Sequence, residues 1–134
     1  MGIGGHTYFK TMTFTDFELS AILRLAHAMA NADGKITETE TAMIILELSR
    51  FGVDQNKAKR LMDIGCGMTY PEACQIISRM TSEEKRYVTA YLGAMICIDG
   101  DIDESETKLW SLITVLCDLP KMNIGEALQI MANL

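Results

Sequence analysis

The chain has 134 residues, of which 49% are hydrophobic and 22% are charged, and its formal net charge is −6. This composition is typical of a folded domain and excludes a disordered chain. The acidic balance argues against nucleic acid or an anionic membrane surface as the main partner. Because only two prolines occur alongside ten methionines, helices are favoured over strands. We therefore predict one all-α domain over residues 14–134, preceded by a disordered or loosely attached N-terminus, residues 1–13.

The remaining composition excludes several common functions. The four cysteines form no CxxC pair, so we expect neither a disulfide framework nor a zinc site. The apolar run over residues 88–98 is too short to span a bilayer, and the start of the chain lacks the pattern of a signal peptide. No GxSxG, GK[ST] or HExxH motif occurs. We expect a cytoplasmic, non-enzymatic protein with no catalytic residues and no transmembrane segment.

The first predicted helix begins at the capping box Thr15-x-x-Glu18. Its apolar residues, from 19 to 30, follow the i, i+3, i+4 spacing of a buried helical face. We expect Gly34 to end this helix as a left-handed cap. Thr37-x-x-Glu40 then predicts a second helix over residues 38–51.

Two further helices are expected in the middle of the chain. Asp54 is a good N-cap for a helix that reaches residues 62–64, and we expect Gly65 and Gly67 to end it. Thr69-x-x-Glu72, with a proline in the first turn, predicts a helix that continues to about residue 80.

Three more helices complete the chain. Thr81-x-x-Glu84 begins a long apolar helix that we expect Gly100 to end. Asp103-x-x-Glu106 begins a helix over residues 104–117, and Asn123-x-x-Glu126 begins a terminal one. The sequence thus predicts a compact bundle of about seven helices.

An internal repeat relates the two halves of the chain. A shift of 66 residues places Asp33-Gly34 on Asp99-Gly100, Glu40 on Glu106, and Thr15 on Thr81, without a gap. Such self-similarity is typical of one supersecondary unit used twice. We therefore predict a pseudo-twofold bundle in which both Asp-Gly turns lie on one face.

The two turns match the sequence pattern of the second half of a calcium-binding EF-hand loop, but the residues before them do not match the pattern of the first half. With Glu40 or Glu106 as the last ligand, the first position is Met29 or Met95. A thioether is a poor ligand for a hard cation, which prefers oxygen. A standard EF-hand is therefore excluded in both copies.

Acidic residues nevertheless gather at both turns, and five carboxylates fall within residues 99–106. Helix capping explains Glu40 and Glu106 but does not require the others. Three explanations stay open: solvated caps, a divalent cation such as Ca²⁺ or Mg²⁺, and a basic protein partner. The candidate metal ligands are Asp33, Glu38, Glu40, Asp99, Asp101, Asp103, Glu104 and Glu106.

The repeated pattern [AM]-x-x-x-DG-x-[IV]-x-x-x-E, at Met29–Glu40 and Met95–Glu106, resembles the tellurite-resistance TerB-like family. That family also includes the N-terminal region of a membrane-anchored DnaJ-type co-chaperone, and the resemblance extends from about Thr15 to Cys117. It implies a bacterial seven-helix bundle linked to stress and metal resistance. It also implies an interaction module that acts near the membrane and is not an enzyme.

The resemblance also implies divalent-cation binding at Asp33, Glu38, Glu40, Asp99, Glu104 and Glu106. Lys35 stands in the first turn where the second has Asp101, so we expect the second site to bind more strongly. The chain has no His-Pro-Asp motif, and hence no J-domain activity is expected. The sequence leaves two roles open, a cation-binding module and a protein-binding scaffold, and a homo-oligomer is compatible with either.

Overall fold

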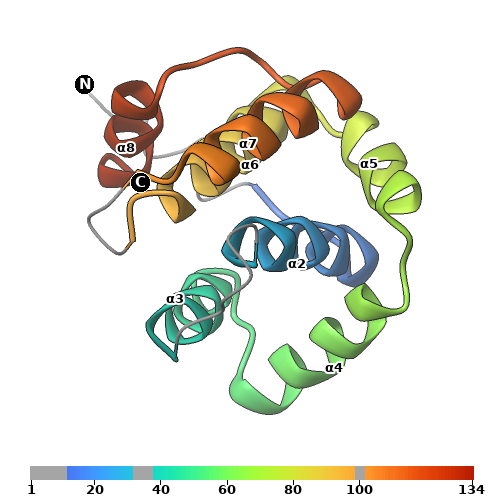
Figure 1. Cartoon of the computed structure of the whole chain (residues 1–134). Coiled ribbons are helices and arrows are strands. Elements are labelled where there is room, and N and C mark those ends of the chain that lie inside the picture. The colour runs from blue at the N-terminus through green and yellow to red at the C-terminus, as the bar shows by residue number, and fades with distance from the viewer. Residues whose placement is uncertain (1–11, 32–37, 99–101) are drawn as a thin grey trace, which may run out of the picture.

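The computed structural model describes residues 12–31, 38–98 and 102–134, which form seven α-helices and no strand (Figure 1). The expected all-α bundle of about seven helices is confirmed for this part of the chain. In the same residues, no helix combines the length and apolar character that a bilayer crossing requires. The helices are α2 (Asp16–Ala30), α3 (Glu38–Ser49), α4 (Gln55–Cys66), α5 (Tyr70–Ser78), α6 (Ser82–Met95), α7 (Glu104–Leu116) and α8 (Ile124–Ala132).

Capping boxes begin four helices where the sequence predicts them. In each box the N-cap side chain accepts the amide of the third helical residue, and the glutamate there accepts the N-cap amide in return. Asp54 caps α4 by accepting the amide of Lys57 at 2.8 Å. The box predicted at Thr37 lies outside the described residues. The four N-cap residues are Thr15, Thr69, Thr81 and Asn123.

Two predicted helix ends are wrong, and for α4 the prediction is right for Gly67 but wrong for Gly65. Helix α2 ends before Gly34, with Asn31 as its C-cap, and α6 ends before Gly100, with Ile96 as its C-cap. Helix α4 continues through Gly65, and Gly67 is its C-cap. Gly65 is needed for packing, because a Cβ atom there would lie 2.7 Å from the backbone carbonyl oxygen of Ser20 in α2.

Helix α2 occupies the middle of the bundle, where it packs against α4, α5, α6 and α7 (Figure 1). Helix α6 packs mainly against α8. Gly93 in α6 lets α7 and α8 each pack closely on α6, since a Cβ atom there would lie 2.6 Å from the ring of Trp110 and 3.0 Å from Ala127. The Trp110 indole is buried and donates to the carbonyl oxygen of Thr89 at 3.1 Å.

Helix boundaries follow the 66-residue offset of the sequence repeat. Helices α2 and α6 begin at residues 16 and 82, and α3 and α7 begin at residues 38 and 104. The packing of α2 on α4 also corresponds to that of α6 on α8. The superposition of the two halves about a pseudo-twofold axis stays a prediction.

Candidate functional site

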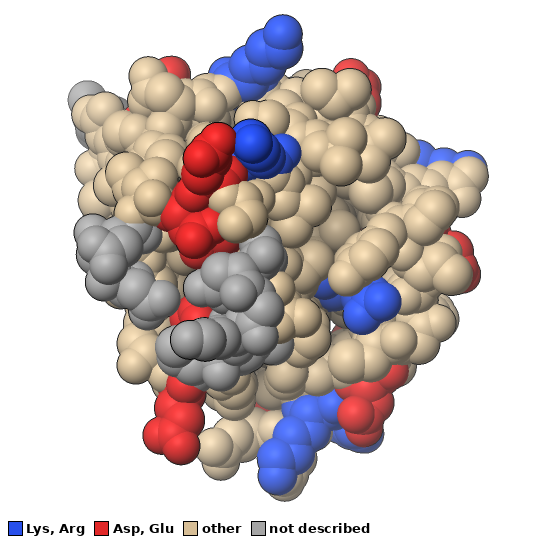
Figure 2. Space-filling view, in the orientation of Figure 1, with Lys and Arg blue, Asp and Glu red and all other residues tan. Residues whose placement is uncertain are grey.

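Five of the eight predicted ligand residues fall in the described part of the chain, at the starts of α3 and α7. In Figure 1 both helix starts, and the ends of α2 and α6 that precede them, lie toward the left of the view. Figure 2, in the same orientation, shows several acidic side chains toward the left of the view. Asp33, Asp99 and Asp101 lie outside the described residues, so the shared face stays a prediction. The five placed residues are Glu38, Glu40, Asp103, Glu104 and Glu106.

Glu40 and Glu106 are buried, with 3% and 6% of their surface exposed. They are equivalent in the repeat, and no other charged residue in the described ranges is buried. The glutamates of the four observed capping boxes occupy the same third helical position but are exposed or half-buried. Capping therefore does not account for the burial of Glu40 and Glu106.

At the start of α7, capping is carried out by Asp103. Its carboxylate accepts the amides of Ser105 at 2.8 Å and Glu106 at 3.3 Å, as well as the Ser105 hydroxyl. The hydrogen bond from the Ser105 hydroxyl, with those from the two amides, lowers the pKa of Asp103. Within the described part of the chain, the reciprocal hydrogen bond of a capping box, from the Asp103 amide to the Glu106 side chain, is not formed. The Asp103 carboxylate thus serves as the cap of α7.

The Glu104 and Glu106 side chains differ in their surroundings. Glu104 is exposed and pairs with Lys108 at 3.1 Å across one helical turn. Glu106 lies near the thiol of Cys97, whose pKa is raised by burial and then by the negative charge of Glu106. Glu38 is exposed at the start of α3. The structure therefore separates one buried glutamate at each helix start from the exposed acids around it.

The chemistry of these residues fits a hard cation only in part. Carboxylate oxygens are suitable ligands for Ca²⁺ and Mg²⁺. Within the described ranges, however, no group of three or more His, Cys, Asp or Glu side chains is close enough to hold a metal ion. A complete site at either turn would need ligands from outside those ranges, and the candidates there are Asp33, Asp99 and Asp101.

A second polar group, which the sequence did not predict, joins α3 to α6. The Tyr87 hydroxyl donates to Glu47, and Glu47 also pairs with Arg50 at 2.8 Å. Burial raises the pKa of Tyr87 well above its usual range, and the charge of Glu47 adds to the effect. Tyr91 stacks on Tyr87 with the ring centroids 6.1 Å apart. The apolar spacing of α6 is a local signal that favours burial of both tyrosines, but the sequence gives no signal of the distant Glu47.

An apolar groove of about 320 Å³ separates α7 from α2 and α5. Along α7 it is bordered by residues at i, i+3, i+4 and i+7, and two of these, Leu112 and Leu116, are 54% and 60% exposed. Tyr70 forms the opposite rim, with the Arg24 guanidinium carbon 4.5 Å from its ring centroid. The helical period of α7 is visible in the sequence, but which of its faces remains uncovered depends on the bundle.

The fold and these sites define an all-α helical bundle with two repeat-related buried glutamates. The chain is similar to a protein of unknown function from Porphyromonas gingivalis W83, and matches its crystal structure with 43% sequence identity and a TM-score of 0.80. The match covers 92% of this chain and 99% of that chain. This chain belongs to the same family as the P. gingivalis protein. No family model and no curated protein matches the chain.

Proposed function

We propose that the chain is a non-enzymatic helical binding module whose acidic turns hold a divalent cation, Ca²⁺ or Mg²⁺. The burial of Glu40 and Glu106 at equivalent positions supports this proposal most strongly. The second turn is the stronger site because it has Asp101 where the first has Lys35. The proposed role in a bacterial stress response, near the membrane and in the cytoplasm, rests on the resemblance to the TerB-like family.

Removing a carboxylate from water is unfavourable unless hydrogen bonds or an opposite charge stabilise it. An exposed glutamate would serve helix initiation equally well, as the other capping glutamates do. A buried carboxylate at the start of a helix, next to a turn rich in acidic residues, gains the attraction of a divalent cation in a medium of reduced dielectric constant. This gain gives the burial of Glu40 and Glu106 a physical reason.

Thermal unfolding with and without millimolar Ca²⁺ or Mg²⁺ tests the proposal. A ligand at one hundred times its Kd stabilises the folded state by about 2.7 kcal/mol, which raises Tm by several degrees. We expect this increase for the wild type and a clearly smaller one for Glu106→Gln. Glu72→Gln is the matched control, because Glu72 has the same capping position in α5 but is exposed.

The control should show the full increase in Tm. An equal increase in Glu106→Gln and the wild type would contradict the role of Glu106. The absence of any increase in the wild type would contradict the cation-binding function altogether.

A second candidate function is a protein-binding scaffold, which the groove beside α7 favours. Its exposed apolar residues repeat at the spacing with which one helix packs on another. The first turn of the same helix holds the acidic residues Glu104 and Glu106, and Asp103 is its N-cap. The partner that fits is an amphipathic helix with an apolar face and basic residues, since its charges complement this end of α7.

A synthetic amphipathic peptide of about 15 residues, with leucines on one face and lysines on the other, probes this function. We expect fluorescence anisotropy to show binding that Leu112→Gln weakens by about tenfold or more. Val115→Gln is the control, because Val115 is 71% exposed on the same helix but does not line the groove. Failure of the peptide to bind, or equal weakening by both substitutions, would contradict docking in the groove.

A further inference from the structure

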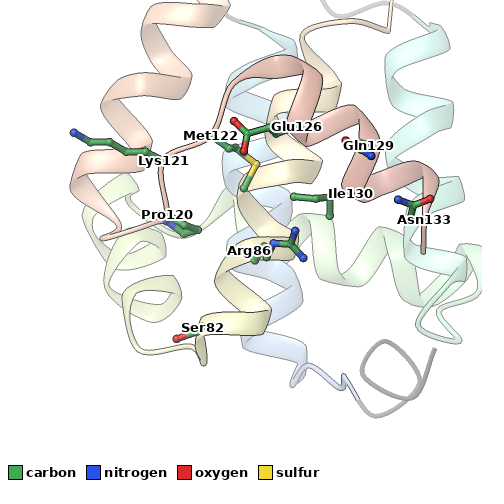
Figure 3. A pocket seen from close by; sticks show the side chains of 9 residues that line it. All are labelled: Ser82, Arg86, Pro120, Lys121, Met122, Glu126, Gln129, Ile130 and Asn133. Atoms are coloured by element: carbon green, nitrogen blue, oxygen red, sulfur yellow. The ribbon is translucent and has the colours of Figure 1, made fainter. Parts of the chain in front are cut away.

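A larger pocket, of about 560 Å³, lies between the start of α6, the connection from α7 to α8, and α8 itself (Figure 3). Among the described residues, none from the acidic turns or the apolar groove lines this pocket. Its volume is within the range of small-molecule sites in proteins, about 300–1,000 Å³. The residues that give it polar character are Ser82, Arg86, Lys121, Glu126, Gln129 and Asn133.

The pocket is cationic although the chain is acidic. Arg86 and Lys121 line it, against the single carboxylate of Glu126, while the whole chain has a net charge of −6. In the described ranges neither Arg86 nor Lys121 forms an ion pair, whereas the neighbouring Lys85 pairs with Asp118 at 3.2 Å. The Glu126 carboxylate is held at the start of α8, where it accepts the amide of Asn123 at 3.1 Å.

Apolar and amide side chains complete the lining. Figure 3 shows the Arg86 guanidinium below Ile130, between α6 and α8. The Lys121 side chain extends to the left of the view, away from Arg86. Pro120, Met122 and Ile130 form an apolar wall. Gln129 and Asn133 are one helical turn apart on α8, and their amides provide further hydrogen-bond donors.

We propose that this pocket binds a monocarboxylate that carries an apolar stem. The planar guanidinium of Arg86 matches a carboxylate in two parallel hydrogen bonds, and the stem lies against Met122 and Ile130. A ligand with a single negative charge suits Arg86 better than a dianion does, because the Glu126 carboxylate in the same lining repels a second negative charge. The carboxylate belongs either to a small organic acid or to the C-terminus of a peptide.

Titration of the full chain with hexanoate, followed by ¹H–¹⁵N NMR, tests the proposal. We expect saturable shifts confined to the amides around Arg86, Met122 and Ile130, and none with hexanol at equal concentration. Arg86→Gln should weaken the binding by about tenfold or more, as is typical of a lost charged hydrogen bond. Arg60→Gln is the control, because Arg60 is also an exposed arginine but lies on α4, outside the pocket.

A tetrapeptide ending in leucine separates the two sources of the carboxylate. Tighter binding of its free acid than of hexanoate, together with no binding of its C-terminal amide, assigns the pocket to peptide termini, and the reverse order assigns it to small acids. Equal shifts with hexanoate and hexanol, unchanged affinity in Arg86→Gln, or shifts that map to the groove beside α7 would overturn the proposal. A thermal melt of Arg86→Gln checks that the variant is folded.

Discussion

Gly65 lies in α4 and Gly67 is its C-cap, and the structure predicts different changes in stability when each is replaced by alanine. A Cβ atom at residue 65 would lie 2.7 Å from the backbone oxygen of Ser20, well below the 3.4 Å at which ordinary contacts begin. The Ser20 oxygen is part of the backbone of α2, so the two helices must move apart. At residue 67 the nearest atom would be 3.5 Å away, which is ordinary contact.

The cost of Gly65→Ala follows from two opposing terms. Forcing an extra methyl group into a packed interface costs about 1–3 kcal/mol, and alanine returns up to about 1 kcal/mol through its higher helix propensity. We therefore expect a net loss of roughly 1–2 kcal/mol in the free energy of unfolding. Gly67→Ala should change it by no more than about 0.5 kcal/mol, because its φ of −82° is accessible to alanine.

Urea denaturation followed by circular dichroism measures both values. The Cm of Gly65→Ala should decrease while the m-value stays constant, which is the signature of a change in stability rather than in compactness. A Gly65→Ala variant as stable as the wild type would refute the close packing of α4 on α2. Equal losses in both variants would refute the assignment of the effect to the Ser20 contact.

The other predictions concern the polar group between α3 and α6, the groove and the cationic pocket. Tyr87→Phe should cost about 1–2 kcal/mol, because it removes the hydrogen bond to the half-buried Glu47. Tyr91→Phe should be neutral or slightly stabilising in the same urea assay, since the buried Tyr91 hydroxyl has no hydrogen-bond partner among the described residues. The raised pKa of Tyr87 means that the folded state keeps a proton which the unfolded state loses near pH 10, so stability should decrease as the pH rises above about 10. Tyr87→Phe should decrease less steeply there, and an identical pH profile would contradict the role of Tyr87. For the groove, weaker peptide binding in Leu112→Gln than in Val115→Gln is expected; for the pocket, weaker hexanoate binding in Arg86→Gln than in Arg60→Gln.

The sequence predicts the helices well because caps and apolar periods are local signals. Thr15, Thr69, Thr81 and Asn123 each begin a helix at the predicted place. Helix ends are predicted less accurately. Gly65 looks like a helix stop in the sequence, but a glycine is needed there because the backbone of Ser20, 45 positions earlier, lies too close for a side chain. Such a contact depends on how two helices pack, which the local pattern does not contain.

At the candidate site too, the sequence shows the local pattern but not what depends on helix packing. Acidic residues and their repeat are visible in the sequence, and so is the third-position glutamate of a helix cap. The sequence does not distinguish Glu106, which is buried, from Glu126, which is exposed in the same capping position. Nor does it place Arg86 beside α8, because that pocket arises from the packing of α6 on α8.

Isothermal titration calorimetry with Ca²⁺ tests the central claim most directly, because it measures cation binding itself. The wild type should bind with measurable heat, and the double variant Glu40→Gln/Glu106→Gln should bind at least about tenfold more weakly, since each proposed site loses its buried carboxylate. Glu18→Gln/Glu72→Gln, which alters two capping glutamates that are not buried, should bind like the wild type. Equal Ca²⁺ affinity in the wild type and in the Glu40→Gln/Glu106→Gln variant would contradict the claim.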